Sequence, residues 1–332
     1  MVSKFYRFLL HNQVILALFI LVMGWLILQI RGIIVSIFLA YVIMAAMLPA
    51  VRYFRKLGLP QVLAVLIPYV AMFILIFMLI VPLIPFVVAQ LGSLLTGFPN
   101  YINDSAHTLG FQVDSSQIKD YVSKELGSIG KNAIGVTSIV FGGLLSTLTV
   151  LVVSFYFLMY TDSFKHKVAS LFDEEHRAHV RETMRLIDDK LGAWLRGQVV
   201  LCFAIGLTTW IILSILHVPN ALPLALIAGL LEILPTLGPI LAAVPAVVVA
   251  LTVSPTLAIA VAVAYLLIQA LENNLLVPKI MQRAVGLNPV MVILAIMIGA
   301  NLMGIVGALL AIPFVSFIIV LFNSINEPVV EK

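Results

Sequence analysis

The sequence predicts an all-α polytopic membrane protein. We expect about six spanning helices, two re-entrant hairpins of broken helix in an inverted repeat, and an external and a cytoplasmic amphipathic helix. Three observations predict this class. Hydrophobic residues make up 62% of the chain and charged residues only 10%, whereas soluble domains carry about 25% charge. Apolar runs of spanning length alternate with short basic stretches. Two apolar runs in the carboxy-terminal half are interrupted by proline and glycine.

Residues 1–61 are expected to form a transmembrane helical pair and a cytoplasmic loop. The first apolar run, Val14 to Ile30, follows basic residues, which places the amino terminus in the cytoplasm by the positive-inside rule. Arg31 and Gly32 then predict a tight turn, and Ile33 to Pro49 returns through the membrane. Each run has about 17 residues, or about 25 Å as a helix, which is short but sufficient for a span.

Residues 62–161 are expected to hold a long kinked span, an external amphipathic segment and a second span. Val62 to Gln90 exceeds the roughly 20 residues that a span needs and contains three prolines. The polar stretch Leu91 to Lys131 has balanced charges and a capping-box pattern at Asp114 to Gln117, which is typical of an amphipathic helix outside the membrane. Ile134 to Tyr160 crosses again.

Residues 162–197 form the most basic stretch, so they are expected to be cytoplasmic. Apolar residues recur there at helical spacing, which predicts an amphipathic helix. They are Val180, Met184, Ile187, Leu191 and Trp194. Glu175, His176 and His179 lie close together, but they neighbour arginines on a solvated face, where supported metal ligands are not expected. We therefore expect no metal site.

Two units are expected beyond residue 197, each a span plus a hairpin: 198–254 and 255–323, followed by a polar tail at 324–332. Val199 to His217 runs outward, and Lys279 and Arg283 mark the stretch after residue 271 as cytoplasmic. The run Ala221 to Leu251 must then enter and leave on the outer side. The alternative is a proline-kinked helix that crosses once.

The interruption within this run predicts a functional site. Pro235 and Pro239 lack an N–H, and Gly238 tolerates backbone angles that other residues resist. A broken helix survives in hydrocarbon only where protein or water covers it. Glu232 is an ionisable group among leucines and needs a partner, water or a proton, so it marks a transport site.

An internal similarity extends this reading to the end of the chain. The segment Gly238 to Pro245 resembles Val306 to Pro313, and the second run is interrupted at Gly299 to Gly304. Inverted repeats with discontinuous helices are a transporter design. The alternative is a chance match between strings of Ala, Leu, Ile and Pro.

Polar residues after the span Thr256 to Leu271 complete the candidate site. Gln269, Glu272 and Asn273 share a helix face by their spacing. Equally, they could cap the span's cytoplasmic end, with Glu272 paired to Lys279. Helix N-termini after Pro235 and near Gly304 suit oxygen-rich or anionic solutes. The expected pathway residues are Glu232, Pro235, Gly238, Pro239, Gln269, Glu272, Asn273, Asn274 and Asn301, and the expected structural or gating residues are Pro278, Lys279, Pro245 and Pro313.

Three motifs resemble the AI-2E family of bacterial transporters, which includes autoinducer-2 exporters. They are Gly229 to Pro239, Gln269 to Met281, and Val285 to Pro289, and the start of a span at Arg196-Gly-Gln also fits. The resemblance implies a multi-pass protein of the bacterial inner membrane that exports small molecules and forms homo-oligomers, pentamers in this family. Some members resemble sodium (lithium)/proton antiporters in activity. Many members carry Asn at the position of Glu232, so autoinducer-2 itself does not follow.

We therefore expect an exporter of a small polar solute, autoinducer-2-like, that works by alternating access at the two hairpins. The alternative within transport is a monovalent cation (Na⁺ or Li⁺)/proton antiporter that uses Glu232; a non-transporting scaffold is a third possibility. An enzyme is not expected, since no His-Glu-x-x-His or Gly-x-Ser-x-Gly motif occurs. No cofactor is expected, and the net charge of +4 is explained by cytoplasmic loops without nucleic acid.

Overall fold

The computed structural model describes residues 13–74, 147–235, 237–281 and 288–326. These ranges contain helices and no strand, as the sequence predicts. The helices are α2 (Gln13–Lys56), Gln61–Ile74, Thr147–Met159, α6 (Thr161–Ala169), α7 (Glu174–Ile215), α8 (Ala221–Leu231), α9 (Leu237–Val253), α10 (Pro255–Leu271), the π-helical turn η1 (Glu272–Leu276), α11 (Val277–Ile280) and α12 (Pro289–Asn326). The expected external segment, 91–131, lies outside the described residues.

Within these ranges, four helices are long and apolar enough to cross a membrane. They are Leu28–Lys56 of α2, all of α7, Pro255–Ile280, and Val290–Ile325 of α12. A fifth span results if Thr147–Met159 and α6, bent by 68°, are counted together. The protein is therefore a multi-pass helical membrane protein.

The expected turn at Arg31 and Gly32 is wrong, because α2 continues through both residues as one 44-residue helix. Arginine is a good helix former, and a single glycine costs a helix only about 1 kcal/mol. A Cβ at Gly32 would meet nothing within 4 Å, so no packing forces a bend there. Arg31 instead donates from Nη1 to the carbonyl oxygen of Leu302 in α12, at 3.2 Å.

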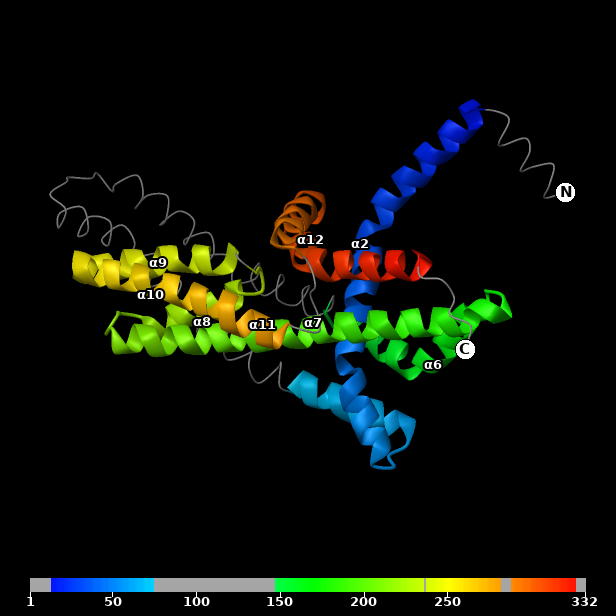
Figure 1. Ribbon diagram of the computed structural model, residues 1–332, viewed down its shortest axis with the longest axis horizontal. Coiled ribbons are helices and arrows are strands. Elements are labelled where there is room, and N and C mark those ends of the chain that lie inside the picture. The colour runs from blue at the N-terminus through cyan, green and yellow to red at the C-terminus, as the bar shows by residue number, and fades with distance from the viewer. Residues whose placement is uncertain (1–12, 75–146, 236, 282–287, 327–332) are drawn as a thin grey trace, which may run out of the picture.

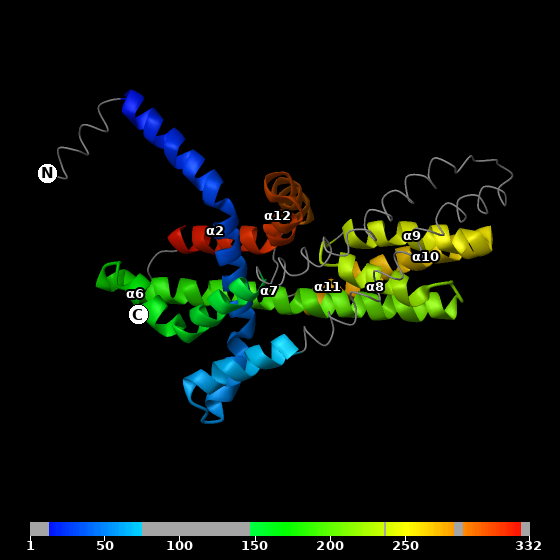
Figure 2. The same ribbon diagram turned by 180° about the vertical axis from the view of Figure 1, so that it is seen from behind.

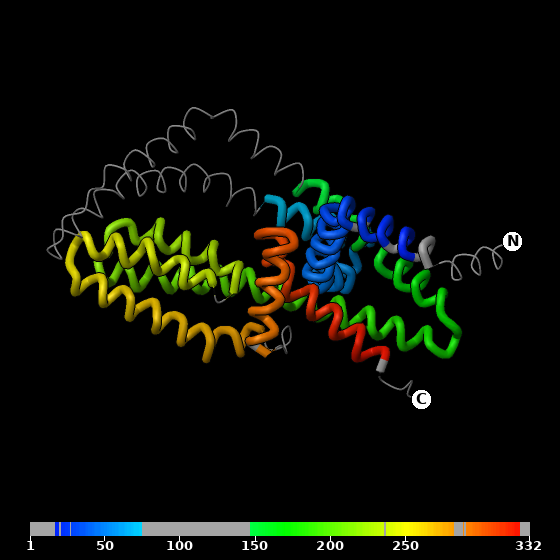
Figure 3. Tube along the Cα trace, turned by 90° about the horizontal axis from the view of Figure 1, so that it is seen from above, coloured from blue at the N-terminus to red at the C-terminus, as the bar shows by residue number. Residues whose placement is uncertain are grey.

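Helix α7 is the axis of the molecule (Figure 1). Along its carboxy-terminal half pack α8, α9 and α10, whereas α2 crosses its other half, where α6 and α12 also lie. The views from behind and from above show the same two groups at opposite halves of α7 (Figures 2 and 3). Each group has its own buried cluster, one around Leu213, Leu224 and Ala246 and the other around Leu191 and Trp194.

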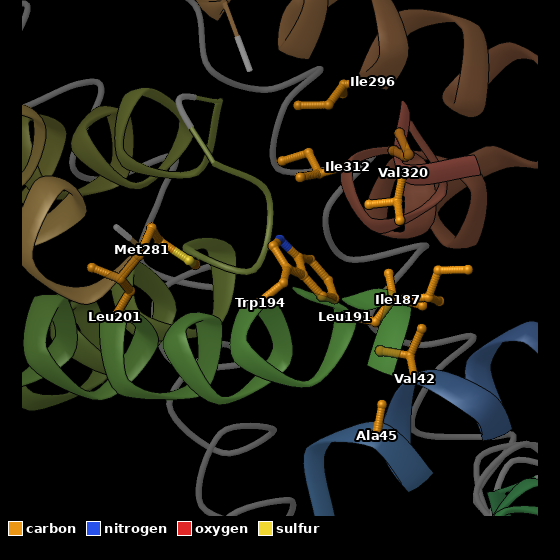
Figure 4. Close-up of a cluster of buried hydrophobic side chains, with 12 residues drawn as sticks. Val42, Ala45, Ile187, Leu191, Trp194, Leu201, Met281, Ile296, Ile312 and Val320 are labelled. Carbon is orange, nitrogen blue, oxygen red and sulfur yellow. The ribbon is translucent and has the colours of Figure 1, made fainter. Parts of the chain in front are cut away.

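The predicted amphipathic face of residues 180–194 is confirmed. Ile187, Leu191 and Trp194 are buried, and Figure 4 shows them beside Val42 of α2 and Ile312 of α12. This helix and the predicted span from Val199 are one uninterrupted helix of 42 residues, about 63 Å long. Its amino-terminal half therefore extends well beyond the roughly 30 Å of hydrocarbon.

Polar contacts fasten α2 and α6 to this half of α7. Tyr41 of α2 donates to Oδ1 of the buried Asp188 at 2.6 Å, and Lys165 of α6 pairs with Oδ2 of the same carboxylate. Nearby, Arg196 donates to the carbonyl oxygen of Ala46 at 3.0 Å. A buried carboxylate with two donors is satisfied, so this cluster joins three helices.

Helix α12 is interrupted where the sequence predicts a break. Met303 (φ −142°, ψ 19°) and Gly304 (φ 61°, ψ −143°) have non-helical angles. The segments before and after the break touch, since a Cβ on Gly299 would lie 2.3 Å from the carbonyl oxygen of Gly307. Helix α10 also differs from expectation, because the helix does not end at Leu271 but continues through η1 into α11.

Candidate functional site

The chain reverses between α8 and α9, in the turn that begins at Glu232 and includes Pro235. The backbone N–H groups of the turn and of the start of α9 donate hydrogen bonds to carbonyl oxygens a few residues earlier. They are Glu232 N–H to Ala228 O (3.0 Å), Leu234 N–H to Leu231 O (2.9 Å), Leu237 N–H to Pro235 O (2.9 Å) and Gly238 N–H to Leu234 O (2.9 Å). Since Pro239 has no N–H, the first three residues of α9 keep no free donor. The described N–H groups at this helix N-terminus thus donate within the chain, and the expected anion site there stays a prediction.

The turn is held against α7 by a tight helix crossing. A Cβ on Gly229 of α8 would lie 2.9 Å from the carbonyl oxygen of Cys202 and 3.1 Å from Cα of Gly206, both on α7. Only glycine allows this approach. One turn away, Nε2 of Gln198 donates to the carbonyl oxygen of Glu232 at 2.7 Å, and Gln198 is itself buried. Helix α7 therefore positions the turn through both a backbone contact and a side-chain hydrogen bond.

Two buried carboxyl groups meet at this turn. Glu232 is 0% exposed and Glu272, from η1, is 2% exposed. The two carboxyl groups are close enough to interact electrostatically. Nε2 of Gln269 donates to Oε2 of Glu272 at 3.3 Å, whereas neither carboxyl oxygen of Glu232 has a donor among the described residues.

Among the described residues, no ion pair gives these two carboxyl groups a compensating positive charge. Two adjacent carboxylates in a buried, low-dielectric site cannot both remain charged and unpaired. Without a basic partner, such a pair holds one proton or one cation.

The π-helical turn decides which of the predicted polar residues face this pair. Gln269 and Glu272 share a face as predicted and bond to each other. Asn273 and Asn274 are exposed, and Nδ2 of Asn274 donates back to Ala270 O at 2.8 Å. A π turn closes i→i+5 hydrogen bonds and so rotates the residues after Glu272 away from the α-helical positions that the sequence spacing assumed.

The remaining predicted residues lie apart from the carboxyl pair or serve the backbone. Pro235 is half-buried in the turn, and Gly238 and Pro239 are buried at the start of α9. Lys279 is exposed and forms no ion pair with Glu272 among the described contacts, so the expected pairing of these two is wrong. Pro278 and Asn301 are exposed, Pro245 is half-buried within α9, and Pro313 is buried within α12.

The sequence interpretation missed two neighbours of Glu232. Gln198 was placed only in the motif that opens a span, and Cys202 was not among the expected pathway residues. The Cys202 thiol lies within electrostatic reach of Glu232 and within hydrogen-bonding reach of the Gln198 side chain. Their spacing of four residues in an apolar helix was the available signal.

The residues considered for metal binding do not come together in the structure. Nε2 of His179 lies 2.8 Å from the carbonyl oxygen of Ser324, and Glu175 and His176 are exposed. Within the ranges that the structure describes, no three His, Cys, Asp or Glu side chains are grouped as a metal site would require.

Comparison with known proteins agrees with the resemblance seen in the motifs. A sequence model of the AI-2E family transporters matches residues 14–327. The chain is 28% identical to "Putative transport protein YrrI" of Bacillus subtilis over 84% of this chain and 82% of that protein. It is 28% identical to "Putative transport protein MT0215" of Mycobacterium tuberculosis over 88% and 83%. It is 30% identical to "Putative permease PerM" of Escherichia coli K12 over 43% and 41%.

Proposed function

Because the chain belongs to the AI-2E family of transporters, it is a membrane transport protein and not an enzyme, and we propose that it exports a small polar solute by alternating access at two broken helices. One observation carries the proposal. The turn between α8 and α9 holds a buried carboxyl pair that forms no ion pair among the described residues. Such intramembrane ionisable groups mark substrate and ion pathways.

The lengths of α8 and α9 support a re-entrant hairpin. Helix α8 has 11 residues and α9 has 17, which give about 16 Å and about 25 Å. The hydrocarbon is about 30 Å thick, so α8 is too short to cross it alone and α9 is at the short end of the spanning range. The two helices pack side by side and return to the end of α7 from which they start (Figure 1). We propose that the break in α12 is its inverted counterpart, with Asn301 beside it.

The orientation and assembly of the protein belong to the same proposal. The basic amino-terminal half of α7 favours a cytoplasmic location for that half. We propose a bacterial inner membrane as the location of the protein; the cytoplasmic amino terminus was expected from basic residues before a helical pair, whereas α2 is one continuous helix. Family resemblance further suggests a homo-oligomer, a pentamer, which chemical cross-linking in membranes would test.

The carboxyl pair also favours a second candidate function, a monovalent cation/proton antiporter. Two oxygen-rich groups that require one positive charge between them can exchange H⁺ for Na⁺ or Li⁺, since hard cations prefer oxygen ligands. The exporter and the antiporter differ in what moves against the proton.

One vesicle experiment tests both candidates. Purified protein in proteoliposomes with an internal pH dye is exposed to a pH gradient, with autoinducer-2 inside in one arm and NaCl or LiCl in the other. Solute-dependent proton movement supports the exporter, and cation-dependent movement supports the antiporter. Glu232→Gln and Glu272→Gln should abolish either signal, whereas Glu182→Gln, a change at an exposed residue paired with Arg185, should not. Unchanged flux in both pair variants would reject the proposal.

A further inference from the structure

Buried polar atoms without partners are concentrated around the carboxyl pair. In the described ranges they are Trp194 Nε1, Gln198 Oε1, Thr209 Oγ1, both carboxyl oxygens of Glu232, Tyr265 OH and Ser316 Oγ. All but Ser316 belong to α7, α10 or the turn between α8 and α9. Native proteins leave few buried polar groups unpaired, because each unpaired group has lost its water without gaining a partner. Such a concentration therefore calls for a functional reason.

Polar side chains on α7 and α10 form two rows that begin at the carboxyl pair, and three of them, Gln198, Thr209 and Tyr265, have such unpaired atoms. On α7, Gln198, Cys202 and Thr209 recur at spacings of four and seven, on one helix face. On α10, Tyr265, Gln269 and Glu272 recur at four and three, again on one face.

Both rows lead in the same direction. Helices α7 and α10 contact each other and run antiparallel (Figure 1). Thr209 lies about 16 Å along α7 from Gln198, and Tyr265 about 10 Å along α10 from Glu272. The α7 row runs from Gln198 toward the carboxy-terminal end of α7, and the α10 row runs from Glu272 toward the amino-terminal end of α10. Because the helices are antiparallel, these two ends lie on the same side (Figure 1). Thr209 is 0% exposed and Tyr265 5% exposed, so the rows lie inside the helical group.

The other side of the pair is closed by apolar packing. One turn before Gln198, Trp194 is 1% exposed and belongs to the same buried cluster as Leu191 and Met281. Figure 4 shows its indole between Met281 and Leu201 on one side and Leu191 on the other. A Cβ on Gly197 would lie 2.8 Å from the Met281 sulfur, so little space remains beside it.

We propose that the two rows line a narrow aqueous path along which water and protons reach Glu232 and Glu272 from the carboxy-terminal end of α7. Thr209, Tyr265 and Gln269 hydrogen-bond the water in this path, and Trp194 with Met281 seals the pair from the opposite end. The path carries protons to a carboxyl group and returns them to water, with no other bond formed or broken. The inference rests on the proposed role of the pair in transport, and it adds the route and the side of access.

The single cysteine of the chain is a built-in probe of this path, because Cys202 lies in the α7 row beside Glu232. The full-length protein in proteoliposomes is treated with membrane-impermeant methanethiosulfonates, one cationic and one anionic. In a Cys202→Ala background, Thr256→Cys at the start of α10 and Ser170→Cys after α6 identify the two sides. We expect Cys202 to react only from the Thr256 side. The carboxyl pair should favour the cationic reagent about tenfold, a difference of about 1.4 kcal/mol in barrier.

Variants of three kinds test whether the unpaired buried groups line a water path or are only unpaired. The double variant Thr209→Val, Tyr265→Phe removes both hydroxyls with little change in volume and should slow labelling about tenfold, equivalent to about 1.4 kcal/mol. Ser316→Ala removes an equally buried hydroxyl on α12 and should leave labelling unchanged. Trp194→Ala should open labelling from the Ser170 side.

The path is overturned if Cys202 of the folded protein does not react from the Thr256 side, or if the double variant labels like the parent. Size-exclusion profiles verify folding of each variant. Labelling requires no transport, so the two proposals can fail separately. Normal transport without labelling rejects the path alone, and predicted labelling with transport unaffected by Glu232→Gln rejects the proposed function alone.

Discussion

Replacing Gly229 by alanine tests whether the α7–α8 crossing holds the carboxyl pair in place. The added Cβ would lie 2.9 Å from the carbonyl oxygen of Cys202 and 3.1 Å from Cα of Gly206. Both contacts are with backbone, so no flexible side chain can move aside. Overpacking of this kind costs about 1–3 kcal/mol, partly offset by the gain of up to about 1 kcal/mol from replacing glycine in a helix. We expect a net loss of about 1–2 kcal/mol.

The matched control is Gly24→Ala in α2, where a Cβ would meet nothing within 4 Å and only the helix gain remains. Thermal unfolding of the detergent-solubilised proteins should rank Gly24→Ala at or above the parent and Gly229→Ala below it, by roughly 2–4 °C for each kcal/mol. Displacement of α8 should also weaken the bond from Gln198 to Glu232 and reduce transport. A Gly229→Ala protein as stable and as active as the control would refute this account of the crossing.

Three further predictions follow from single positions. Glu272→Gln should unfold at higher temperature than the parent at alkaline pH and not at neutral pH, because two neighbouring buried carboxylates repel each other once both are charged. Equal melting temperatures across pH would argue against a shared charge. Ser254→Ala removes the hydrogen bond that the side chain accepts from the N–H of Leu257 (3.1 Å), and it should destabilise α10 by about 1 kcal/mol. The control in the same melting assay is Ser170→Ala, at an exposed position. Gly304→Ala places a side chain at φ 61°, ψ −143°, angles that essentially only glycine adopts. It should cost about 1–3 kcal/mol of stability, although a Cβ there would meet no neighbouring atom. A melting temperature equal to that of the parent would contradict the strained break.

Local chemistry made several features of the fold predictable. The break at Pro235 to Pro239 and the break near Gly304 follow from missing N–H groups and from glycine, which are properties of single residues. The buried face of Ile187, Leu191 and Trp194 follows from helical spacing. The class of the protein follows from its composition, since so few charges cannot cover a soluble surface.

Where a helix stops within apolar sequence was less predictable. Arg31 and Gly32 resembled a turn, but α2 continues through them and Arg31 bonds to Leu302 of a distant helix. Glu272 resembled the first residue of a loop, yet it continues the helix and is 2% exposed. Propensity differences near 1 kcal/mol are too small to decide these boundaries against packing.

By itself, the sequence determined that the chain is a multi-pass helical membrane protein, that two of its helices are interrupted, and that Glu232 lies at one interruption. Only the tertiary structure decided what Glu232 meets there. Gln198 and Glu272 are 34 and 40 positions away in the chain. They reach it because α7 and α8 touch at two glycines and because the helix of α10 continues past Leu271, which keeps Glu272 on the buried face of Gln269. Contacts between distant helices depend on how surfaces pack, and residue type and spacing along one segment carry no information about that.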